Sequence, residues 1–423
     1  MALLAASSMW FYVDRILVGH QVADAAEHDR PRGNLSDLYP RWLGARELLR
    51  HGRNPYSHEI TLEIEQGYYG RVLDASRPND PKDQQGFAYP VYVVFLLAPL
   101  TGLSFHTVQI CFHWLLVVLT AASVLLWLRV LRWRLPLIFG AIGVALTLGS
   151  VPAVQGIKLQ QLSLLVAALL AASAASAVGG FRFSSGVILA LATIKPQMTW
   201  PIVIWMLVWA ASDWKTRRRF LFGFAAMMAA LLIGAEIVLP GWWRMFWEAI
   251  RQYHQYTQNQ SVLDQLVNWL LGSHGGQVLA ALAVLASAVP LWKLRREPAG
   301  SEAFGRAAAL VTALTVLIVP MFAPYNQVLL LPAILLLARE RGALTLGSRA
   351  MRFVYALAGF CLAWQWVASL GLSLAWLVSP AEALNGWKLP FYATFALPVL
   401  VFVLVVSPVQ HQGRVLRANE ATE

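Results

Sequence analysis

Apolar stretches of roughly 15 to 25 residues recur from one end of this chain to the other. A helix needs about 20 residues to cross the hydrocarbon core of a bilayer, so each stretch is a candidate membrane span. Of the 423 residues, 58% are hydrophobic and only 13% are charged, whereas about a quarter of residues are charged in soluble proteins. The sequence therefore predicts an all-α fold, a polytopic integral membrane helical bundle.

We expect about twelve spans in a single membrane domain over residues 1–423. The first, Met1–Val13, meets charged residues without a preceding cleavage site, which indicates a span and not a removable signal peptide. It is short for a span, which leaves open a native start upstream. The other apolar segments lie near residues 91–103, 108–128, 135–154, 162–178, 187–211, 220–239, 278–291, 307–321, 328–338, 353–377 and 391–406.

Two longer polar stretches, at residues 20–87 and 240–276, separate these segments. Clusters of Lys and Arg at 215–219, 293–296 and 339–352 should be cytoplasmic by the positive-inside rule, and they account for much of the net charge of +11 without a nucleic acid partner. Both polar stretches are then extracytoplasmic loops, and we expect a multi-pass protein of the cell inner (plasma) membrane. A helix break at Lys195-Pro196 would bring Lys195 and Gln161 to the same outer face.

Asp37 begins the densest group of polar and aromatic residues in the first loop. The residues after it have helical apolar spacing, which predicts a short interfacial helix over about residues 38–49. A carboxylate at a helix N-terminus is often a structural cap. It is also suited to act as a general base that takes a proton from an acceptor hydroxyl. Both interpretations remain open on the sequence alone.

Lys195 lies inside an apolar segment, where a charge costs at least about 2.5 kcal/mol at the bilayer centre and so indicates a function. It could bind a phosphate, or its side chain could reach the membrane surface. Gln160 and Gln161 either join helices by hydrogen bonds or contact a substrate. The aromatic run that starts at Trp242 favours an interface anchor over a sugar-stacking surface.

A series of short motifs gives a more specific indication. Asp37 and Tyr39 precede a Leu-rich helix and a Gly-x-x-Pro-Tyr motif that ends at Tyr56. This order resembles glycosyltransferase family 87, the polyprenol-phosphate-mannose-dependent mannosyltransferase and arabinofuranosyltransferase group of the GT-C superfamily. More segments resemble the family pattern in the expected order: Phe87–Pro90, Leu97–Leu100, Gln160–Leu165, Leu191–Pro196 and Asn259–Ser261.

The chain departs from this pattern at several positions. Val91 replaces a usual Pro, Gln160 a Gly and Ser163 an Asn. The turn Phe322–Gln327 lacks the His that mannosyltransferase members often carry. The reaction type is unaffected, but the sugar stays open as mannose-like or another hexose or pentose.

The resemblance implies transfer of a sugar from a polyprenyl-phosphate donor to a glycolipid or glycan hydroxyl, with inversion by single displacement. Asp37 would be the catalytic base, and Lys195, Arg41 and Arg46 would bind the donor phosphate. The substrate-binding residues would be Tyr39, Tyr56, Tyr89, Gln161, Asn259, Tyr325, Asn326 and Gln327. No metal or other cofactor is expected, because the chain has no Asp-x-Asp pair and its His and Cys residues lack ligand spacing.

The main alternative from another class is a polytopic transporter or lipid flippase. Transporters usually show repeated halves with broken helices at corresponding positions. This chain has one large early loop and no evident repeat, which favours the enzyme. A membrane polysaccharide polymerase or ligase is a third reading, against which only the order of the motifs argues.

Overall fold

The computed structural model describes residues 1–257, 260–272, 274–320 and 322–407. The protein is 77% helical, and no strand occurs in these ranges, which confirms the predicted all-α class. The elements are α1 (Ala2–Phe11), the π-helix η1 (Tyr12–Leu17), α2 (Val18–Glu27), α3 (Tyr39–His51), α4 (His58–Tyr69), α5 (Val93–Leu97), η2 (Ala98–Leu100), α6 (Phe105–Val130), α7 (Leu137–Leu148), α8 (Val151–Lys158), α9 (Leu162–Val178), α10 (Arg182–Ala192), α11 (Pro196–Ala211), α12 (Trp214–Val238), α13 (Trp242–Thr257), α14 (Val262–Leu271), α15 (Gly275–Leu294), α16 (Glu302–Ile318), η3 (Pro324–Leu330), α17 (Leu331–Arg339), α18 (Arg341–Thr345), α19 (Arg349–Val378), α20 (Pro380–Asn385) and η4 (Leu389–Phe391).

Six helical segments in the described ranges are long and apolar enough to cross a membrane. A seventh arises if α7 and α8, which meet at a bend of 57°, form one span. The expected count of about twelve is therefore not confirmed. The difference arises because several apolar segments form helices shorter than the roughly 20 residues that a bilayer requires; α9, for example, has 17 residues.

The first span is longer than its sequence indicates. Helical structure runs without interruption over Ala2–Glu27, which is 26 residues, and so continues beyond residue 20, where the loop was expected to begin. Asp14 in the middle of this segment forms an ion pair with Lys158 of α8. The ion pair lets a charged residue lie within an otherwise apolar helix.

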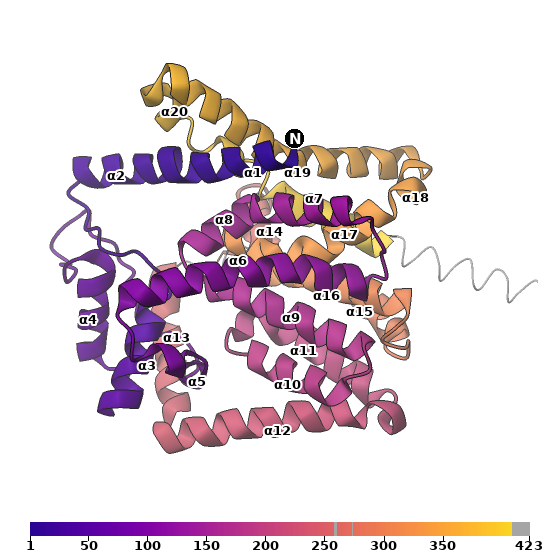
Figure 1. The fold of residues 1–423 in the computed structure, drawn as a ribbon, viewed down its shortest axis with the longest axis horizontal. Coiled ribbons are helices and arrows are strands. Elements are labelled where there is room, and N and C mark those ends of the chain that lie inside the picture. The colour runs from indigo at the N-terminus through magenta and orange to yellow at the C-terminus, as the bar shows by residue number, and fades with distance from the viewer. Residues whose placement is uncertain (258–259, 273, 321, 408–423) are drawn as a thin grey trace, which may run out of the picture.

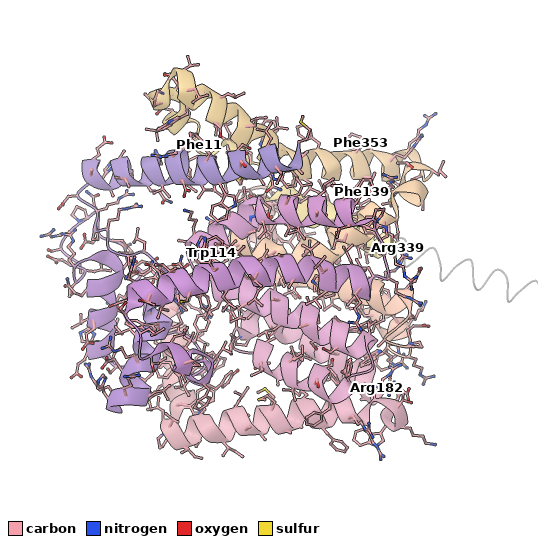
Figure 2. The ribbon with its side chains drawn as sticks, viewed as in Figure 1. Phe11, Trp114, Phe139, Arg182, Arg339 and Phe353 are labelled. Carbon is pink, nitrogen blue, oxygen red and sulfur yellow. The ribbon has the colours of Figure 1, made fainter. Side chains whose placement is uncertain are left out.

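Large apolar side chains cover the outside of the bundle. Trp114, Phe139 and Phe353 are 63%, 56% and 69% exposed, and Figure 2 shows them on three helices on this side of the molecule. Exposed apolar area of this extent is unfavourable in water but suits contact with lipid tails.

The basic clusters come together at one end of the bundle. Arg217 at the start of α12 donates a hydrogen bond to the carbonyl of Arg295 at 2.8 Å, and Arg339 donates to the carbonyl of Leu131. Figure 2 shows Arg339 and Arg182 at this end, whereas α3, α4 and α13, which belong to the two polar loops, lie at the other end (Figure 1). The polar loops and the basic clusters are therefore separated along the bundle, as the charge pattern predicts.

Close contact between α10 and α12 fixes the helix that leads into the site. A Cβ atom on Gly223 would overlap the carbonyl oxygen of Phe183, and one on Gly186 would overlap that of Phe220. Small residues allow membrane helices to approach this closely. On its other side, α10 is joined to α9 by hydrogen bonds between Ser185 and Ser173.

We predict that Gly223→Ala destabilises the protein by about 1–3 kcal/mol, the usual result of overpacking. The matched control is Gly359→Ala in α19, where an added Cβ meets nothing within 4 Å. Thermal unfolding of the purified variants in detergent measures the effect. An equal melting temperature for both variants would contradict the close packing of α10 against α12.

Candidate active site

A cavity of about 670 Å³ lies where the polar loops meet the bundle. Residues from both polar loops line it, together with residues from breaks between helices of the bundle. The lining residues named below come from the first polar loop, the segment before α9, the break between α10 and α11, α13 and the segment that leads into η3. The two polar loops, at residues 20–87 and 240–276, are far apart in the sequence but line one site.

The carboxylate of Asp37 does not cap a helix. The N-cap position of α3 is Leu38, without a side-chain hydrogen bond. Asp37 Oδ1 accepts a hydrogen bond from Tyr68 Oη at 3.2 Å, and Oδ2 accepts one from Gln161 Nε2. Its backbone N–H donates to the carbonyl of Leu159 at 2.9 Å. The capping interpretation is wrong, because the carboxylate accepts from Tyr68 of α4 and from Gln161 and not from the first N–H groups of α3.

Burial raises the pKa of Asp37 above its ordinary value. The positive charges of Arg41 and Lys195 oppose the rise, as do the hydrogen bonds from Tyr68 and Gln161. A carboxyl group with a raised pKa is a stronger base once it has ionised, so this environment suits proton abstraction.

Lys195 occupies the break between α10 and α11, and it is 3% exposed. Its Nζ donates to Ser163 Oγ at 2.5 Å and to Gln161 Oε1 at 3.4 Å, and it lies 5.3 Å from the centroid of the Tyr325 ring. The amine is thus directed into the bundle beside the cavity and does not reach toward the membrane surface. Gln161 connects Lys195 to Asp37.

Arg41 supplies the second positive charge in the cavity. Its guanidinium carbon lies 4.4 Å from the centroid of the Tyr89 ring, and Nη1 donates to the carbonyl of Asp37 at 2.9 Å. Its Nε is buried and has no hydrogen-bond partner among the described residues. The guanidinium lines the cavity and carries the charge that suits an anionic ligand there.

Five of the predicted residues do not line the cavity. Arg46 lies over the Trp42 ring, on another face of α3 from Arg41, because five residues turn a helix through about 140°. Tyr39 packs edge-on against Phe105.

The other three form hydrogen bonds with protein groups. Tyr56 Oη donates to the carbonyl of Tyr89 at 2.5 Å, and Asn326 accepts from Ser163 at 3.0 Å. Gln327 donates to the carbonyl of Thr394 at 2.5 Å. None of the three lines the cavity, and their substrate roles stay predictions. Asn259 lies outside the described residues.

The structure adds roles that the sequence did not assign. Tyr68 donates a hydrogen bond to Asp37, and Ser163 accepts one from Lys195.

One face of α13 lines the cavity, through Phe246, Ile250 and Tyr253. These residues belong to the aromatic run that starts at Trp242, for which the sequence favoured an interface anchor over a sugar-stacking surface. Their spacing of four and three residues places them on one face of the helix.

The comparisons with known proteins agree with the geometry. The model of glycosyltransferase family 87 matches residues 87–320, more than half of the chain. The chain belongs to glycosyltransferase family 87. A search of curated proteins and a search of solved structures each found no match.

Membership of family 87 identifies the protein as a membrane glycosyltransferase. None of these observations supports a transporter or flippase. The matched range contains Gln161 and Lys195 but begins after Asp37. The assignment of Asp37 therefore depends on the motif order and on the contacts in the cavity.

We predict that Arg41→Gln reduces sugar transfer by about 10²- to 10³-fold, the usual loss when a preorganised donor to a developing negative charge is removed. Arg46→Gln removes the same charge from the same helix outside the cavity, and it should retain near-normal transfer. Sugar transfer by membranes that contain equal amounts of each variant is the measurement. Equal losses in the two variants would contradict the selective role of Arg41.

Proposed function

We propose that this family 87 enzyme transfers a sugar from a polyprenyl-phosphate donor to a hydroxyl of a glycolipid or glycan acceptor. The observation that carries the proposal is the shared cavity of one carboxylate, Asp37, and two positive charges, Lys195 and Arg41. The carboxylate suits the attacking hydroxyl, and the positive charges suit a phosphate that leaves with the bonding electrons.

The reaction is a single displacement at the anomeric carbon. Asp37 takes the proton from the acceptor hydroxyl while that oxygen attacks the carbon from the side opposite to the phosphate. The bond between the anomeric carbon and the phosphate oxygen breaks, and the phosphate keeps the electron pair. Lys195 and Arg41 stabilise the growing negative charge, and the configuration of the sugar inverts.

The hydrogen-bond network supports this division of roles. Gln161 donates to Asp37 and accepts from Lys195, so one amide orients both the base and the phosphate-binding amine. Tyr68 fixes the other oxygen of the carboxylate. Catalytic groups need such support, because small displacements from the productive geometry reduce the rate strongly.

A lipid-linked donor agrees with the position of the cavity. The cavity includes both polar loops, and the basic clusters lie at the other end of the bundle. The positive-inside rule then assigns the cavity to the extracytoplasmic face of the cell inner membrane. Nucleotide sugars are made inside the cell, whereas a polyprenyl-phosphate sugar is carried in the membrane itself. Apolar Ile194 and Pro196 beside Lys195 suit the start of a prenyl chain.

Two positive charges are sufficient for the proposed donor. A single phosphate can be held by Lys195 and Arg41 in a cavity of low dielectric, where such pairing is stronger than in water. We therefore propose a reaction that does not depend on a metal ion. The donor sugar is mannose-like or another hexose or pentose.

We predict that Asp37→Asn reduces transfer by about 10²- to 10⁴-fold, the usual contribution of a general base. The base acts in its ionised form, and burial raises its pKa above 3.8. The wild-type rate should therefore fall as the pH drops through a value above 3.8, and this acid limb should be absent from the residual activity of Asp37→Asn. Rate–pH profiles of folded, purified protein provide the measurement, and near-normal turnover by Asp37→Asn would exclude the base role.

The donor is tested with purified protein and a polyprenyl-phosphate sugar in the presence of a chelator. We predict turnover under these conditions. Lys195→Ala should lose more activity than Lys195→Arg, because arginine keeps a positive charge that can pair with phosphate. Activity with a nucleotide sugar, together with none from the lipid-phosphate sugar, would refute the donor assignment.

A further inference from the structure

A second carboxylate lines the cavity, and the reaction proposed above does not use it. Asp83 lies in the segment between α4 and α5 and faces the same cavity as Asp37 and Arg41. It is close enough to interact with the charges of both residues. The charge of Arg41 favours the ionised form of Asp83, whereas the charge of Asp37 opposes it. The cavity therefore holds a second carboxylate beside the base.

Gln85, in the same turn as Asp83, donates two hydrogen bonds to the Asp83 carboxylate. Oδ1 accepts from the backbone N–H of Gln85 and Oδ2 accepts from Gln85 Nε2, both at 2.8 Å. Gln85 has a φ of 57°, which is uncommon for a residue other than glycine. An ionised carboxylate can accept about four hydrogen bonds. Gln85 supplies two, and the remaining positions suit hydroxyl donors in the cavity.

Two adjacent tyrosines at the end of α4, Tyr68 and Tyr69, hold Asp37 and Asp83 in place. Tyr68 Oη donates to Asp37 Oδ1 at 3.2 Å, and Tyr69 Oη donates to the backbone carbonyl of Asp83 at 2.6 Å. The two rings meet edge to face with their centroids 4.8 Å apart. One turn of helix therefore fixes the placement of Asp83 relative to the base.

The position of Asp83 near the base indicates which substrate it meets. The acceptor hydroxyl must contact Asp37 to lose its proton, so the acceptor ring lies beside Asp37. Asp83 and Gln85 line the same cavity and belong, like Asp37, to the first polar loop. They therefore form the wall of the cavity that the acceptor ring would meet.

We propose that Asp83 binds hydroxyl groups of the acceptor sugar and thereby orients its attacking hydroxyl toward Asp37. The inference rests on the proposed function and adds the acceptor class. The acceptor presents a neutral, polyhydroxylated ring at this wall, and an anionic group at the same place would be repelled.

The test uses the full-length protein in lipid nanodiscs with two defined probes. The donor is a short-chain polyprenyl-phosphate mannose, and the acceptors are octyl mannoside and its single-deoxy analogues. Asp83→Asn is the informative variant, because it loses the charge while its Oδ1 can still accept from the Gln85 backbone N–H and its Nδ2 can donate to Gln85 Oε1 once the Gln85 amide flips. Glu59→Gln makes the same charge change at an exposed position of the same loop and is the matched control.

We expect Asp83→Asn to raise the acceptor KM by about 10- to 100-fold, the range for a lost hydrogen bond to a charged group. Because Asp83 also orients the attacking hydroxyl, kcat should fall together with the rise in acceptor KM. The donor KM of Asp83→Asn, and all constants of the Glu59→Gln enzyme, should change less than about twofold. One deoxy analogue should carry a similar penalty with wild-type protein and none with Asp83→Asn, which identifies the hydroxyl that Asp83 binds.

Other results separate this inference from the proposed function. A raised donor KM, a loss confined to kcat, or unchanged kinetics in Asp83→Asn would overturn the acceptor role. Equilibrium binding of radiolabelled octyl mannoside gives a readout without turnover. Binding that depends on Asp83, with no transfer from the polyprenyl-phosphate donor, would support the acceptor site and contradict the donor assignment. No binding by wild-type protein would overturn the acceptor site itself.

Discussion

The site depends on the hydrogen bonds that a buried lysine requires. The ammonium group of Lys195 cannot remain in a low-dielectric bundle without polar partners. Ser163 and Gln161 at the start of α9 provide them, and Ser163 passes the connection on to Asn326 of η3. Three separate parts of the bundle are thereby drawn to one point. Because Gln161 also reaches Asp37, the first polar loop is joined to the same network.

The helix break at Pro196 and the close packing of α10 against α12 together fix the position of Lys195. Pro196 has no backbone N–H, so the helical hydrogen-bond pattern is interrupted there and Lys195 adopts a non-helical backbone at the N-cap of α11. Close contact between α10 and α12 holds the segment before the break. The charged side chain is therefore presented by a rigid frame, which is what a phosphate-binding group needs. The polar loops contribute the base and close the cavity from the other side.

Most of the predicted site residues that line the cavity belong to the hydrogen-bond network of Asp37 and Lys195 or lie beside it. Asp37, Arg41, Tyr89, Gln161, Lys195 and Tyr325 all line the cavity. Arg46 does not line the cavity, because position on a helix face, and not distance along the chain, decides what a side chain can reach. Gln327 does not line it either, because its side chain bonds to Thr394. The number of spans was not confirmed, because an apolar segment does not show by itself whether it forms one long helix or a short, bent one.

What the sequence determined by itself is local: the apolar segments that form helices, the break at Pro196, the motif that begins at Asp37 and the unusual charge at Lys195. A charge in an apolar segment is visible without knowledge of its neighbours, because its solvation cost depends on the segment alone. Only the tertiary structure decided that Gln161 joins these two residues, that Tyr68 holds the carboxylate and that Asp83 faces it. Those contacts connect segments that are far apart in the chain. Their distances are set by the packing of whole helices and loops, and a local pattern of residues does not encode that packing.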